Sequence, residues 1–150
     1  MTKEKLKQYY DCWSAAWSQF RHWMELTDDW RKAAIAVRDG AREFVKQHEA
    51  IHDFAETTMR NLIREADDIC RSHDGTRKVT TDEIRPYYEL WTDAWKSFRQ
   101  WVMSGSDDAT VEESVKDYCK RWATQGHPRF APIVIAELEM AYKENKGDRR

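Results

Sequence analysis

Residues 9 to 23 and residues 87 to 101 carry nearly the same aromatic pattern, and this repeat constrains the fold more than any other feature of the chain. The first segment reads YYDCWSAAWSQFRHW, the second reads YYELWTDAWKSFRQW, and eight of the fifteen positions are identical. So many identities at a fixed offset of 78 residues indicate an internal duplication. The sequence therefore predicts two related structural halves.

The large apolar residues of each copy recur at steps of three and four, which places them on one face of an α-helix, whereas a strand would alternate. Aromatic rings on such a face ordinarily fill the space between packed helices. We therefore expect the two rows to form a core shared by both halves. The rows consist of Tyr10, Trp13, Trp17, Phe20 and Met24, and of Tyr88, Trp91, Trp95, Phe98 and Val102.

The chain contains only 5 Gly and 3 Pro, which is typical of an all-α protein. The stretch TQGHP at 124–128 marks a helix end, because Gly terminates helices and Pro cannot continue them. By the repeat, a bend is also expected near residues 48 to 53, and one long continuous helix there is the alternative. The predicted helices cover about 4–26, 28–47, 50–72, 82–103, 108–124 and 129–146.

The predicted fold is an all-α helical bundle built from two tandem homologous units, of three helices each or of two long helices with the second one kinked. The units comprise residues 1–73 and 82–150, with a linker at 74–81, and they are expected to pack as one domain. Thr27 and Ser106, each followed by two aspartates, are the expected N-caps of the second helix in each unit.

Charge and cysteine content narrow the class of function. A net charge of −2 gives no general attraction for phosphate backbones, so no nucleic-acid partner is expected. Cys12, Cys70 and Cys119 form no C-x-x-C pair, which argues against a disulfide scaffold. No apolar run is long enough for a membrane span, and the amino-terminal residues do not resemble a signal peptide. These features favour a cytoplasmic protein.

The leading functional hypothesis is a non-enzymatic protein-interaction or assembly module that uses its aromatic helix faces, with another protein or a second copy as partner. Trp23 and Trp101 end the outer aromatic row of each repeat and are candidate anchors for such a partner. Arg21 and Arg99, which are equivalent in the two repeats, lie beside these rings and complete the candidate binding set.

The segment HEAIH, residues 48 to 52, resembles the metal-binding helix of zincin metalloproteases. The resemblance implies that His48 and His52 are ligands of Zn²⁺ and that Glu49 is the general base acting on a zinc-bound water. It covers five residues, Asp53 departs from the usual uncharged position, and no G-x-x-H continuation follows. A third ligand is not obvious, although Glu56 lies close in sequence, and Glu65 and Asp68 lie farther along the same predicted segment. A zinc-binding protein or zinc hydrolase is therefore an alternative, while the leading hypothesis requires no cofactor.

A second alternative comes from two arginine–histidine pairs. Five residues separate Arg42 from His48, and five separate Arg121 from His127. This spacing resembles the signature of HEPN-type ribonucleases, whose active site forms between two helical units. The two pairs are out of register by one residue between the repeats, so common inheritance of both is not indicated.

Overall fold

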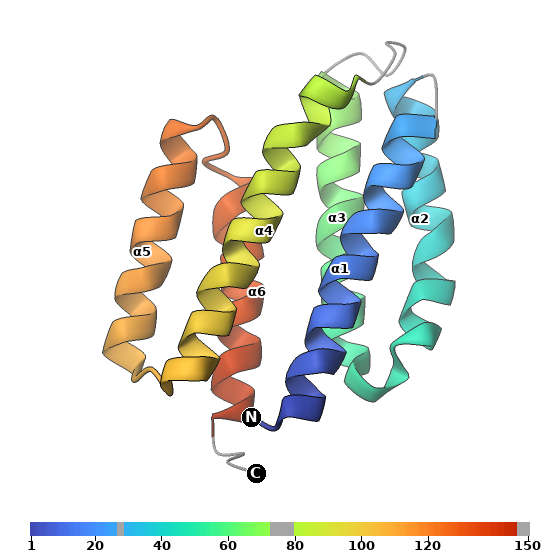
Figure 1. The fold of residues 1–150 in the computed structure, drawn as a ribbon. Coiled ribbons are helices and arrows are strands. Elements are labelled where there is room, and N and C mark those ends of the chain that lie inside the picture. The colour runs from blue at the N-terminus through green and yellow to red at the C-terminus, as the bar shows by residue number, and fades with distance from the viewer. Residues whose placement is uncertain (27–28, 73–79, 147–150) are drawn as a thin grey trace. The chain divides into compact units, whose positions relative to one another are not determined.

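The computed structural model describes residues 1–26, 29–72 and 80–146, and over these residues it contains six α-helices, one 3₁₀ turn and no strand (Figure 1). The all-α prediction is confirmed. None of the described helices is both long and apolar enough to cross a membrane. The elements are α1 (Lys3–Leu26), α2 (Trp30–Gln47), η1 (Glu49–Ile51), α3 (His52–Ser72), α4 (Thr81–Ser104), α5 (Asp108–Thr124) and α6 (Phe130–Asn145).

The bend expected near residues 48 to 53 is present, so α2 and α3 are separate helices. After Gln47 the backbone N–H of His48 donates to the Val45 carbonyl at 3.2 Å, and the 3₁₀ turn η1 then reverses the chain. The corresponding break after α5 contains Gly126 at a φ of +95°, a conformation that favours glycine. A glycine therefore marks the break after α5, whereas no glycine or proline marks the break between α2 and α3.

Aspartates cap α2 and α5 in the same way. The carboxylates of Asp29 and Asp107 each accept a hydrogen bond of 2.8 Å from the backbone N–H three residues later. The expected cap Thr27 lies outside the described residues. The prediction of Ser106 was wrong by one position, because Asp107 supplies the capping oxygen while the Ser106 carbonyl accepts from the Tyr142 hydroxyl at 2.6 Å.

The chain forms two compact units, one of residues 8–88 and the other of residues 1–7 together with 89–150. In the first unit the aromatic row of α1 packs on α3. The ring of Phe54 lies 4.7 Å from Tyr9 in an edge-on arrangement and 6.0 Å from Trp13, between centroids. Gly40 allows α2 to approach α1 closely at Gln19.

In the second unit, α4 packs on both α5 and α6. The Tyr118 hydroxyl of α5 donates to the Leu90 carbonyl of α4 at 2.9 Å. The rings of Trp91 and Phe130 are stacked with centroids 6.5 Å apart, which joins α4 to α6. This contact matches the Trp13–Phe54 contact of the first unit. The match is consistent with the duplication, while the domain boundaries and the facing of the two halves remain predictions.

The aromatic rows form core, as their spacing predicts. Most of their side chains are buried. The exceptions are Val102, which is partly exposed, and Tyr10 and Tyr88, which occupy equivalent repeat positions and are about half exposed, at 49% and 48%. The aromatic faces are therefore used mainly inside the protein. The buried members are Trp13, Trp17, Phe20, Met24, Trp91, Trp95 and Phe98.

Replacing Gly40 with alanine is expected to raise the free energy of unfolding by up to about 1 kcal/mol, because alanine has the higher helix propensity in the middle of α2. The added methyl group would overlap the amide nitrogen of Gln19, which is the flexible end of a side chain and can move away. It would lie at ordinary contact distance, 3.6 Å, from the Trp23 indole nitrogen. Urea denaturation measures the change. A loss of stability would show that Gln19 is held rigidly between the helices.

Candidate functional site

The bend in the chain separates the two histidines of HEAIH. His48 is the C-terminal cap of α2, whereas His52 begins α3, so they do not share one turn of a continuous α-helix. The His48 ring packs on Phe44 with 4.6 Å between centroids. Burial lowers the pKa of His48, and the charge of Asp11 partly opposes that shift.

His52 is engaged by neighbouring carboxylates. Its Nδ1 lies 3.2 Å from Asp53 Oδ1 and its Nε2 lies 3.7 Å from Glu56 Oε2. The hydrogen bond to Asp53 raises the pKa of His52. Within the described ranges, no group of three or more His, Cys, Asp or Glu side chains is arranged to hold a metal ion. Among these residues, His48 and His52 are therefore not part of a group of three possible metal ligands.

We expect the purified protein to hold substoichiometric zinc and to show no peptidase activity, because a zinc site needs at least three protein ligands and no such group is found among the described residues. Elemental analysis after dialysis against a weak chelator measures the metal. His22→Ala, which removes an exposed histidine elsewhere, is the control. A tightly held stoichiometric zinc that is lost in His52→Ala but retained in His22→Ala would contradict this expectation.

The arginine–histidine pairs lie in different surroundings. Arg42 is exposed on α2. Arg121 donates from its guanidinium to Asp93 Oδ2 at 2.8 Å, so it is held by an ion pair. The His127 ring lies 6.2 Å from the Trp122 ring, and burial lowers the pKa of His127. The ribonuclease alternative stays a prediction.

The four partner-binding candidates also differ in exposure. Trp101 is only 1% exposed and belongs to the core. Trp23 is partly exposed, and both Arg21 and Arg99 are exposed. Arg21 is bonded to Glu25 on its own helix, with 3.1 Å between Nε and Oε1. A docking surface built on Trp101 would require the core to open.

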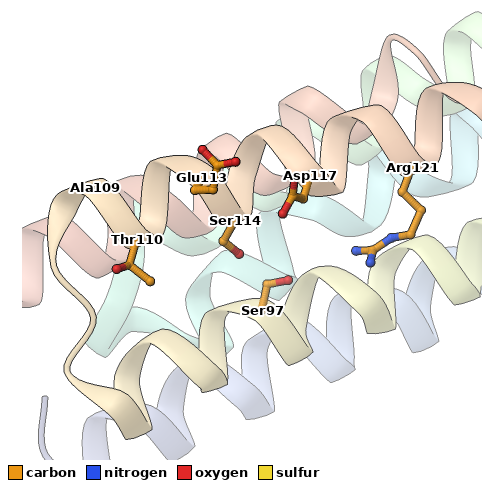
Figure 2. Close-up of a pocket in the computed structure, with 7 residues that line it drawn as sticks. All are labelled: Ser97, Ala109, Thr110, Glu113, Ser114, Asp117 and Arg121. Atoms are coloured by element: carbon orange, nitrogen blue, oxygen red, sulfur yellow. The ribbon is translucent and has the colours of Figure 1, made fainter.

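One hollow of about 580 Å³ lies between α4 and α5 in the second unit. Figure 2 shows Ser97 of α4 and Ser114 of α5 pointing into the space between the helices, and Arg121 reaching toward α4, where it pairs with Asp93. Ala109 is the one apolar residue of the lining, so this furrow has no apolar floor, and its one cation, Arg121, is already paired with Asp93. Its lining consists of Ser97, Ala109, Thr110, Glu113, Ser114, Asp117 and Arg121.

A second hollow, of about 480 Å³, lies between α2 and α3 in the first unit, and we call it the α2–α3 groove. Met59 is buried in it, whereas Ala41, Val45 and Ile63 are partly exposed, so its floor is apolar. Charged side chains form the rim. The lining residues are Ala41, Arg42, Val45, Lys46, Glu49, His52, Glu56, Met59, Arg60 and Ile63.

The charges on the rim are distributed unevenly. On the α3 side, Arg60 pairs with Glu56 at 2.8 Å, and His52 lies beside the same carboxylate. On the α2 side, Arg42 and Lys46 are exposed and make no ion pair with any residue of the described ranges. The groove therefore combines an apolar floor with one uncompensated basic wall.

Sequence reasoning did not identify this groove. Val45 and Ile63 each directly follow a buried residue, Phe44 and Leu62 respectively. An apolar residue next to a core row widens the apolar face of a helix. The sequence thus shows that the apolar faces of α2 and α3 extend to Val45 and Ile63. It does not show that these two residues line the same groove.

Comparisons with protein-family models, with curated proteins and with solved structures gave no match to this chain. The functional argument therefore rests on the geometry of the groove.

Proposed function

We propose that the protein is a helical protein-interaction module that binds an amphipathic helix of another protein in the α2–α3 groove. The observation that carries this proposal is the open groove of about 480 Å³ with an apolar floor and a charged rim. Protein-binding grooves that receive amphipathic helices have this combination, in which side chains at every third or fourth position of the partner enter the groove.

The position of the groove supports a helical occupant. Two packed helices leave a furrow along each side of their contact, and a third helix fits such a furrow at about 8–10 Å between axes. The residues that approach α1, including Gly40 and Phe54, are different from those that line the groove. The pair α2–α3 thus contributes one side to the core and has another side available to a partner.

The proposed binding surface is the α2–α3 groove and not the aromatic helix faces. The sequence suggested the aromatic helix faces, but these are largely buried, so they stabilise the bundle that holds α2 and α3 in place. The floor residues of the groove are aliphatic. Each partly exposed aliphatic side chain that a partner covers contributes roughly 25 cal/mol per Å² of apolar surface removed from water.

The test is selection of helical peptides from a displayed library with unbiased charge, followed by affinity measurement on variants. We expect the selected peptides to be amphipathic, and we expect Val45→Ser and Ile63→Ser each to weaken binding roughly tenfold through lost apolar contact. Ile35→Ser is the matched control, since Ile35 is an aliphatic residue of α2 that is 49% exposed and does not line the groove.

Circular dichroism and urea denaturation of each variant separate a loss of binding from a loss of folding. Peptides that bind Val45→Ser and Ile63→Ser as tightly as the unchanged protein would refute the groove as the docking site. Failure to select any amphipathic peptide would refute the proposed function.

A further inference from the structure

We infer that the helix bound in the α2–α3 groove is acidic, with two carboxylates one helical turn apart on the flank that faces α2. This inference rests on the proposed function and specifies the chemistry of the partner. Its basis is the set of charges that the groove leaves uncompensated.

The basic wall has a definite spacing. Arg42 and Lys46 are four residues apart on α2, which corresponds to about 6 Å along the helix axis. Both side chains are exposed and make no ion pair within the described part of the chain. A partner helix lying along α2 presents its own residues i and i+4 at the same spacing, so two carboxylates at those positions can each meet one cation.

The opposite wall offers no equivalent attraction for a basic helix. Glu56 already accepts from Arg60 at 2.8 Å and lies 3.7 Å from the His52 ring. Glu49, at the corner in η1, is the one carboxylate of the groove lining that has no ion pair among the described residues. A helix carrying lysines would therefore face two uncompensated cations and gain one uncompensated carboxylate.

The preference of the groove for an acidic helix comes from its local charges and not from the charge of the whole chain. The whole chain has a net charge of −2, so it has no general attraction for anions at long range. An acidic helix would gain its advantage only where its carboxylates come close to Arg42 and Lys46. Such short contacts at a partly exposed rim lose strength as salt is added.

The experiment uses two synthetic helical peptides with the same leucine ridge, one carrying glutamates and the other lysines at the flanking i and i+4 positions. We expect the glutamate peptide to bind the full chain on the order of tenfold more tightly in low salt, and we expect the difference to shrink in high salt. In the double variant Arg42→Glu/Lys46→Glu the preference should reverse, so that the lysine peptide binds more tightly.

The control is Lys116→Glu/Lys120→Glu, which makes the same charge reversal at exposed i and i+4 positions of α5, a helix that does not line the groove. It should leave the preference unchanged. A reversal of preference in the groove variant also shows that this variant is folded.

The possible outcomes separate this inference from the proposed function. Equal binding of both peptides, with affinity still lost in Ile63→Ser, would overturn the acidic preference and leave the docking groove intact. An acidic preference that the α5 control also abolishes would show a nonspecific charge effect and overturn the inference. Binding that is insensitive to Ile63→Ser, or absence of binding by either peptide, would overturn both.

Discussion

Replacing Trp101 with alanine is expected to lower the free energy of unfolding by about 3–5 kcal/mol, the range found when a buried aromatic residue is truncated to alanine. The Trp101 side chain is 1% exposed. Its ring lies 5.9 Å from Tyr142 of α6 and 6.4 Å from Phe98 of α4, between centroids, in edge-on arrangements. Truncation would remove these contacts and leave a cavity between α4 and α6. Urea denaturation followed by circular dichroism measures the loss.

Met103 supplies the matched control, because it lies two residues away on the same helix and is 68% exposed. Met103→Ala should change stability by less than about 0.5 kcal/mol. A loss below about 1 kcal/mol in Trp101→Ala would show that the ring is not part of the core. The hypothesis that Trp101 anchors a partner would then regain support.

The helix boundaries could be read from the sequence because periodicity and helix breakers agree. The expected segment 108–124 coincides with α5, and the expected segment 4–26 differs from α1 by one residue. At the end of α5, Gly126 and Pro128 both oppose a continued helix. Local sequence alone is therefore sufficient to predict where α5 ends.

The break between α2 and α3 depends on tertiary packing instead. The residues from His48 to His52 include no Gly or Pro, so a continuous helix remained an alternative. In the structure, Ile51 is buried in the turn and Phe54, just beyond it, packs on Tyr9 and Trp13. Burial of Ile51 and packing of Phe54 against α1 favour the reversal, and neither can be read from local sequence.

Equivalent positions of the repeat also have different surroundings. Trp23 and Trp101 match in the sequence, yet Trp23 is partly exposed whereas Trp101 is buried. Local sequence also does not show which charges are paired, since Arg60 has a carboxylate partner whereas Arg42 has none among the described residues. The groove could not be predicted because it depends on which side chains of two helices meet and which charges are already neutralised.

Replacing Asp93 with alanine is expected to destabilise the protein by about 2 kcal/mol, because it leaves a largely buried donor without its acceptor. The Trp122 indole Nε1–H donates to Asp93 Oδ2 at 2.7 Å, and Trp122 is buried. The same carboxylate oxygen lies 2.8 Å from the Arg121 guanidinium. One side chain of α4 thus holds two consecutive residues of α5.

The two contacts of Asp93 should differ in energy. The Arg121 ion pair is partly exposed, and Arg121→Ala is expected to cost no more than about 1 kcal/mol. Asp93→Asn keeps an oxygen acceptor for Trp122, so its cost should fall between those of Asp93→Ala and Arg121→Ala. Asp82→Ala, which removes an exposed carboxylate 3.7 Å from Arg85 on the same helix, is the control and should have almost no effect. Equal losses in Asp93→Ala and Arg121→Ala would mean that the ion pair, rather than the indole hydrogen bond, fixes α5 to α4.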